Sequence, residues 1–139
     1  MTAALDAIRD EFLALGQRDR LLLLLDYADD LPPLPERYGE HPELLERVTE
    51  CQAPVFVVAA VEDGVVAVHA TAPAEAPTTR GFASVLAHGL NGLSREEALA
   101  VPDDFPDTLG LAGAVSPLRL RGMGGLLQRI KRQLRATPA

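Results

Sequence analysis

Two apolar runs in the middle of the chain predict the strands of a small sheet. The first extends from Val55 to Val61 and the second from Val65 to Ala70, and both are rich in valine. Branched side chains of this kind suit the pleated, packed surface of a strand. The intervening Glu62-Asp63-Gly64 contains Asp-Gly, which is typical of a tight hairpin turn. A brief strand at Arg47–Thr49 would add a third antiparallel member.

Before residue 30 the apolar residues recur at helical spacing instead. A first helix is predicted from Leu5, Ile8, Phe12 and Leu15. Thr2 can cap its start and Gly16 can close it. A second helix, capped by Asp19, carries the leucine run 21–25. It must stop before Pro32-Pro33, because a residue that precedes proline avoids the helical region. We expect these two helices to form a hairpin.

Three further helices are predicted after the strands. The first is capped by Thr78 or Thr79 and ends at Asn91-Gly92. Ser94-Arg95-Glu96-Glu97 is a capping box that precedes a short helix. Ser116-Pro117 places a cap and then a proline at the start of the last helix. The apolar stripe of that helix is formed by Leu120, Met123, Leu127, Ile130 and Leu134.

These elements predict an α+β fold. A small three-stranded antiparallel sheet would be packed with N-terminal and C-terminal helices. The chain has 139 residues, 47% of them hydrophobic and 24% charged, which is ordinary for a globular protein with one core. We therefore expect residues 1–139 to form a single domain.

The last helix contains three glycines, at positions 122, 124 and 125. Each costs about 1 kcal/mol relative to alanine inside a helix. Glycine is accepted where two backbones approach closely or where a helix bends. We favour close packing against the sheet or the first helices over a functional hinge.

Charge is distributed unevenly along the chain. Residues 1–118 carry seven basic and 20 acidic side chains, whereas residues 119–139 carry six basic and no acidic ones. The acidic body argues against nucleic-acid binding by the whole protein. A solvated helix face is the common explanation for the basic end, and an interaction surface is the alternative.

The composition also bears on where the protein works. A single cysteine gives no intramolecular disulfide and is compatible with a reducing cytosol. The N-terminus lacks a basic segment followed by a long apolar one, so we predict no signal peptide. The leucine run 21–25 is far too short to span a membrane. We expect a cytoplasmic protein that is not bound to a membrane.

Cys51 is the candidate for chemistry. A free cysteine is more often a small buried hydrophobe than a reactive group. Here, however, the cysteine lies just outside an apolar run, between Glu50 and Gln52, and Pro54 follows. A polar loop of this kind favours a reachable thiol, and reachable thiolates are the reactive ones. The charge of Glu50 disfavours the thiolate.

Other chemistries find little support. The three histidines, His41, His69 and His88, are far apart in the sequence, and one cysteine cannot make a cysteine-rich zinc site. We therefore predict no metal. His69 is better explained as a partly buried histidine with its hydrogen bonds satisfied. Gly-x-Gly-Gly at 122–125 lacks the preceding strand that a phosphate loop needs.

The segment Glu50-Cys51-Gln52-Ala53-Pro54 at the start of a strand resembles the SufE family of iron–sulfur cluster assembly. Further similarity lies in the proline-rich 31–35, in 72–83 after the hairpin, and in 115–123 at the last helix. The resemblance covers most of the chain. Many members have glycine where this chain has Glu50.

This resemblance implies a fold, a partner and a role for individual residues. Cys51 would accept a persulfide sulfur from a cysteine desulfurase, stimulate that enzyme and pass the sulfur on to an iron–sulfur scaffold. The desulfurase would hold pyridoxal phosphate, and this chain would need no cofactor. Gln52 and Arg119 would support the reaction, Arg119 by favouring the Cys51 thiolate or by contacting the partner. A surface ion pair is the alternative for Arg119.

Two other function classes remain open. The chain could regulate a desulfurase without carrying sulfur, or it could be a single-cysteine redox sensor. A carrier brings one further expectation. An exposed persulfide would be lost to stray thiols, so Cys51 would rest against apolar neighbours of the sheet and the loop would move when the desulfurase docks.

Overall fold

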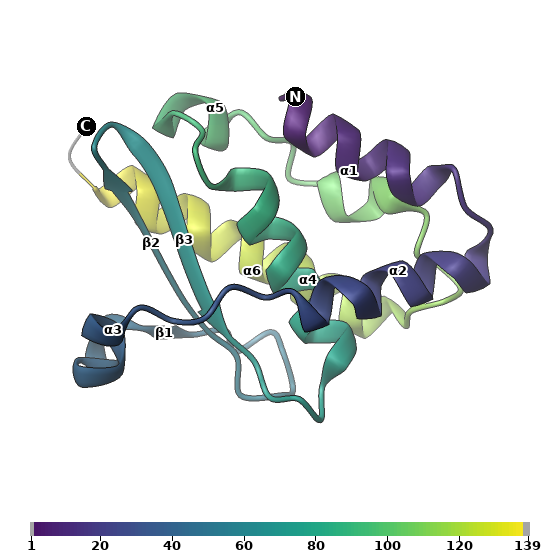
Figure 1. The fold of residues 1–139 in the computed structure, drawn as a ribbon, viewed down its shortest axis with the longest axis horizontal. Coiled ribbons are helices and arrows are strands. Elements are labelled where there is room, and N and C mark those ends of the chain that lie inside the picture. Colours follow the sequence, from purple (N-terminus) through teal and green to yellow (C-terminus); the bar gives the residue numbers. More distant parts are fainter. Residues whose placement is uncertain (1, 138–139) are drawn as a thin grey trace.

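A computed structural model describes residues 2–137 of the chain, and Figure 1 shows their arrangement. The helices and strands, in order, are α1 (Ala3–Leu13), α2 (Gln17–Asp29), α3 (Glu36–Glu40), the 3₁₀ helix η1 (Pro42–Leu44), β1 (Glu46–Arg47), β2 (Phe56–Glu62), β3 (Val65–Thr71), α4 (Pro77–Leu90), α5 (Arg95–Leu99), the 3₁₀ helix η2 (Phe105–Leu109) and α6 (Pro117–Ala136). The predicted α+β class is confirmed.

The three strands form one antiparallel sheet in the order β1-β2-β3. Asp63 and Gly64 form the hairpin turn with φ of 52° and 81°, as Asp-Gly predicts. The strand predicted at 47–49 is β1, which lies one residue earlier and is shorter. It ends at Arg47, because Val48 is fully buried at the start of a loop. Because β1 pairs only with Phe56 and Val57, the rest of that edge of β2 has no strand beside it in the described part of the chain. There the Ala59 N–H donates a hydrogen bond to Gln133 Oε1 of α6 at 2.7 Å.

Helices α4 and α6 cover one face of the sheet (Figure 1). Alternate residues of β2 and β3 face these helices, as the two-residue period of a strand requires. The buried set on this face is Val57, Ala59, Val66, Val68 and Ala70. Helices α1 and α2 pack against α4, so α4 lies between them and β3. The apolar side chains of these layers form one contiguous core.

The opposite face of the sheet is partly covered by α3. The Tyr38 ring of α3 lies 5.4 Å from the His69 ring of β3, measured between ring centroids. His69 is half-buried, but within residues 2–137 its Nε2 atom has no hydrogen-bond partner. The prediction of a satisfied histidine is therefore wrong for that nitrogen, because the Tyr38 ring packs beside the His69 ring and Nε2 is buried without an acceptor in that range. Burial lowers the pKa of His69.

Several predicted helix ends shift by a few residues. Helix α1 ends at Leu13, and Gly16 precedes α2 instead of closing α1. The reason lies in Arg20, whose guanidinium donates to the carbonyl oxygens of Phe12 at 2.9 Å and Leu13 at 3.4 Å. These bonds satisfy carbonyl groups that the end of a helix leaves free.

Some of the predicted helix caps are confirmed and others are not. Ser94 forms the capping box with Glu97, and Ser116 accepts from the Arg119 N–H at 3.3 Å, so both predictions are confirmed. Thr2 makes no capping hydrogen bond, and Asp19 lies inside the first turn of α2. Helix α4 begins at Pro77, ahead of either predicted threonine, because proline suits the first helical position, where no N–H is required.

In residues 2–137, no helix combines the length and the apolar character that crossing a bilayer requires.

Candidate functional site

Cys51 lies in a compact loop between β1 and β2. The Val48 N–H donates to the Val55 carbonyl at 2.8 Å and closes the base of the loop. The Cys51 N–H then donates to the Val48 carbonyl at 3.1 Å. Pro54 has no N–H to satisfy at this turn. The prediction that Glu50, Cys51 and Gln52 lie in a loop before the strand is therefore confirmed.

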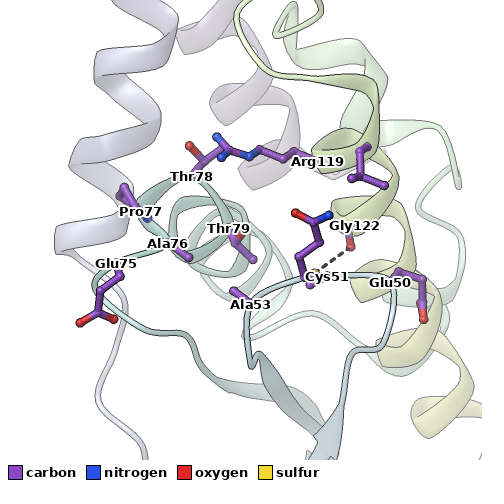
Figure 2. A pocket seen from close by; sticks show the side chains of 12 residues that line it. Glu50, Cys51, Ala53, Glu75, Ala76, Pro77, Thr78, Thr79, Arg119 and Gly122 are labelled. Atoms are coloured by element: carbon purple, nitrogen blue, oxygen red, sulfur yellow. Dashed lines mark hydrogen bonds between the residues drawn. The ribbon is translucent and has the colours of Figure 1, made fainter.

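The thiol of Cys51 points inward, although its loop lies at the surface. The residue is only 9% exposed, and its Sγ lies 3.7 Å from the Gly122 carbonyl oxygen of α6 (Figure 2). The prediction of a readily reachable thiol is therefore wrong for this conformation. The companion expectation of a sheltered thiol holds, and the contact that the thiol makes is with Gly122 of helix α6.

The glycines of α6 make room for this loop. A Cβ atom at Gly122 would lie 3.1 Å from Cys51 Sγ, and one at Gly125 would collide with the side chain of Glu50. Gly124, between them, has nothing within 4 Å of such an atom. Close packing is thus confirmed for two of the three glycines. Their partner is the cysteine loop, which the sequence did not indicate.

A pocket of about 280 Å³ opens beside Cys51. It is bounded by the cysteine loop, the first turn of α4 and the start of α6 (Figure 2). Its lining residues are Glu50, Cys51, Gln52, Ala53, Glu75, Ala76, Pro77, Thr78, Thr79, Leu118, Arg119 and Gly122. The thiol therefore adjoins a pocket whose wall consists mainly of small and polar side chains.

On the other side of the loop lies a charged group that we call the Arg129 cluster, made of Glu46, Thr49, Glu50 and Arg129. Arg129 Nε donates to both carboxylate oxygens of Glu50 at 3.1 Å, and Nη2 donates to Thr49 Oγ1 at 2.8 Å. The guanidinium also forms ion pairs with Glu46 and Glu50. A planar guanidinium has the donors for such a set of partners.

These surroundings keep the resting thiol protonated. Burial raises the pKa of the Cys51 thiol, the negative charge of Glu50 raises it further, and the positive charge of Arg129 acts against both. Hydrogen bonding to Arg129 in turn holds the pKa of Glu50 below its usual range. The charge of Glu50 is therefore present at neutral pH, and the thiol is weakly nucleophilic in this conformation.

The chain is similar to known proteins along most of its length. Residues 6–134 match the family model described as SufE: Fe-S metabolism associated domain. An uncharacterised SufE-like protein of Mycobacterium tuberculosis is 49% identical over 136 residues, which cover 97% of this chain and 94% of that protein. The chain belongs to the SufE family.

Two further proteins extend the comparison. A SufE-like protein of Synechocystis is 31% identical over 99 residues, covering 71% of this chain and 59% of that protein. The solution structure of a hypothetical protein from Thermus thermophilus superimposes with a TM-score of 0.83 and 42% identity. It covers 96% of this chain and 94% of that one, so the α+β arrangement is shared along nearly the whole length.

The three site residues that the SufE resemblance suggested all line one pocket. Cys51 and Gln52 come from the loop, and Arg119 comes from the first turn of α6. Figure 2 shows the Arg119 side chain extending from α6 toward the start of α4. The charged groups that act on the pKa of Cys51 are Glu50 and Arg129. The role of Arg119 stays a prediction.

Arg129 is the residue that sequence reasoning missed. It was counted only as part of the basic end of the chain. The available signal was the coincidence of that basic end with two acidic residues, Glu46 and Glu50, directly before the cysteine. Within the part of the chain that the structure describes, His, Cys, Asp and Glu side chains form no group of three or more able to hold a metal ion.

Proposed function

We propose that this SufE-family protein carries sulfur as a persulfide on Cys51. The observation that supports the proposal is the position of the only cysteine. It is buried and lines a pocket formed by the loop, α4 and α6, in a chain of a family associated with Fe-S metabolism. A single thiol beside a pocket suits a carrier that accepts and releases a single atom.

The transfer is a displacement at sulfur. The Cys51 thiolate attacks the outer sulfur of a persulfide on the partner's cysteine, and a new S–S bond forms on Cys51. The S–S bond within the partner breaks, and the partner's thiolate leaves with the electron pair. A proton moves from the Cys51 thiol to the departing thiolate. No external oxidant or reductant is consumed.

The partner is a cysteine desulfurase, whose pyridoxal phosphate releases sulfur from cysteine. Removal of the sulfur by this chain frees the desulfurase cysteine for another cycle, which accounts for stimulation. An iron–sulfur scaffold would receive the sulfur next. A chain with a single free cysteine is compatible with a reducing cytosol, so we place the reaction in the cytoplasm.

The redox-sensor alternative has less support. Sensor cysteines are accessible and have a low pKa, because oxidants attack the thiolate. Cys51 is buried, and burial together with Glu50 raises the pKa of its thiol. The purely regulatory alternative differs from the carrier in one respect, since it needs no thiol.

Desulfurase stimulation tests the proposal. Sulfide release from cysteine is measured with the wild-type chain and with Cys51→Ser, a change of one atom in the same buried position. We expect the variant to fold, to bind the desulfurase and to lose stimulation. Stimulation by Cys51→Ser equal to that by the wild type would instead establish the regulatory alternative.

A further inference from the structure

The Arg129 cluster connects α6 to the cysteine loop and to the strand that precedes it. Glu50 lies in the loop next to Cys51, whereas Glu46 lies in β1. Both carboxylates pair with the Arg129 guanidinium, and Glu46 also contacts Arg132 and Gln133 of α6. Because Glu50 and Cys51 are adjacent, a movement that carries the Cys51 backbone away from α6 also pulls Glu50 away from Arg129.

Two glycines of α6 make room for the loop in the position that the structure shows. Gly122 and Gly125 are about one helical turn apart on α6, and they admit Cys51 and Glu50 respectively. Any side chain at Gly125 would occupy the space of Glu50. The helix therefore contains a shallow seat for two consecutive loop residues, and Arg129, four residues beyond Gly125, holds the second of them.

The strength of the contact is intermediate. The Arg129 side chain is 18% exposed, while those of Glu46 and Glu50 are 25% and 37% exposed. Partly exposed pairs are weak singly but gain from bidentate geometry and from a network. Such a contact can keep a loop closed most of the time and still open without unfolding the core.

We propose that Arg129, which Glu46 of β1 holds in place, is a positioning residue whose ion pair with Glu50 keeps the cysteine loop against α6 with the thiol buried, and that release of this pair exposes the thiol. The carrier function gives this opening its purpose, because a docking desulfurase would have to reach Cys51. The opening itself is a property of the free chain and needs no desulfurase.

Opening also changes the reactivity of the thiol. Burial is the largest cause of the raised pKa of Cys51, and Glu50 is the second. When the loop leaves its seat, the burial effect weakens, whereas Glu50 stays beside Cys51 and Arg129 no longer opposes it. The exposed thiol is therefore more accessible, and relief from burial, the largest cause, favours its ionisation. Glu75 and Arg119 also line the pocket and remain near the thiol's path to solvent.

Alkylation of the single cysteine by iodoacetamide measures this opening directly. The rate is followed by intact mass in the free protein across a pH series. Its high-pH plateau reports accessibility, and its midpoint reports the pKa of the thiol. We expect Arg129→Gln to raise the plateau rate roughly fivefold, the size of effect that a partly exposed ion-pair network can have. Glu50→Gln should raise the plateau similarly and lower the midpoint.

Arg121→Gln is the matched control. It removes the same charge from α6, at a position beside Asp103 and Asp107 and away from the cysteine loop. Its plateau rate should stay within about twofold of the wild type, as for other surface substitutions. Arg129→Lys should keep part of the closure, because it retains the charge without the planar set of donors.

Salt dependence of the wild type provides a second, independent measurement. Raising the ionic strength screens exposed charges, so the wild-type plateau rate should rise with salt. Equal plateau rates in wild type, Arg129→Gln and Glu50→Gln, or a wild-type rate insensitive to salt, would overturn the proposal. If Arg129→Gln fails to fold, Glu50→Gln and the salt series decide the question. Loss of desulfurase stimulation in Cys51→Ser is scored separately, so the two proposals can fail independently.

Discussion

Helices α4 and α6 both use glycine for close packing, but they do so against different partners. In α4, Gly81 faces the Leu24 backbone of α2 and Gly89 faces the Leu5 side chain of α1. These contacts are apolar or involve the backbone, and they lie in the core. In α6, Gly122 and Gly125 face Cys51 and Glu50 of a surface loop that ion pairs hold in place. The α4 contacts hold the fold together, whereas the α6 contacts can break and form again as the loop moves.

This difference is a physical one. Core packing of the first kind is lost only when the helices separate, which unfolds the protein. A loop held by partly exposed ion pairs opens locally, at a free-energy cost well below that of unfolding. The predictions below break or sharpen the contrast, beginning with the largest expected effect.

Replacement of Gly81 by alanine should damage the fold. The added Cβ would collide with the backbone carbonyl of Leu24, which cannot move aside as a flexible side chain can. Overpacking of this kind costs about 1–3 kcal/mol in the free energy of unfolding. Urea denaturation measures the loss. Gly89→Ala should cost less, because its neighbour is the end of the Leu5 side chain, and equal costs would contradict this reasoning.

Gly122→Ala and Gly124→Ala form a matched pair on α6. Gly124 has open space beside it, so alanine there should stabilise the helix by about 1 kcal/mol. At Gly122 the new methyl group lies against Cys51 Sγ, so the propensity gain is offset and the loop is displaced. We expect faster iodoacetamide alkylation of Cys51 in Gly122→Ala only. Similar alkylation rates in both variants would show that the loop does not rest on α6.

The pH midpoint of Cys51 alkylation should lie above that of an ordinary cysteine. Burial and Glu50 raise the pKa of the thiol, so less thiolate is present at any pH below the midpoint. The reference is the same protein unfolded in urea, in which burial is absent and the midpoint should fall. Coincident midpoints in the folded and unfolded states would contradict a buried resting thiol.

Arg119→Ala should give the smallest effect on stability and a moderate one on sulfur transfer. Arg119 is exposed at the start of α6, so the free energy of unfolding should change by less than about 0.5 kcal/mol. A loss of transfer that Arg119→Lys largely restores would indicate support of the thiolate by charge. A loss that lysine does not restore would indicate a bidentate contact with the partner. Wild-type transfer and binding would make Arg119 only a surface residue.

The elements that sequence predicted well are those whose causes are local. Asp63-Gly64 determines its own turn, and the Ser94 and Ser116 caps act within three residues. Helix ends were less accurate where a distant group intervened, as Arg20 does at the end of α1. Propensity alone contains no record of such contacts.

The candidate site divides along the same line. A loop carrying Cys51 follows from the adjacent residues. Its burial depends on Gly122, 71 positions away, and its charged surroundings depend on Arg129, 79 positions from Glu50. Contacts between residues so far apart in the sequence produce no periodic or local pattern from which they could be predicted. The glycines were noticed as unusual, but their partner required the folded chain.

The most direct test of the carrier account is the mass of the protein after incubation with a cysteine desulfurase and cysteine. The account predicts an added mass of one sulfur atom on the wild-type chain, located on Cys51 by peptide mapping and removed by a reducing thiol. Cys51→Ser should stay at its original mass under the same conditions. A wild-type chain that stimulates the desulfurase but never gains the sulfur atom would contradict the account.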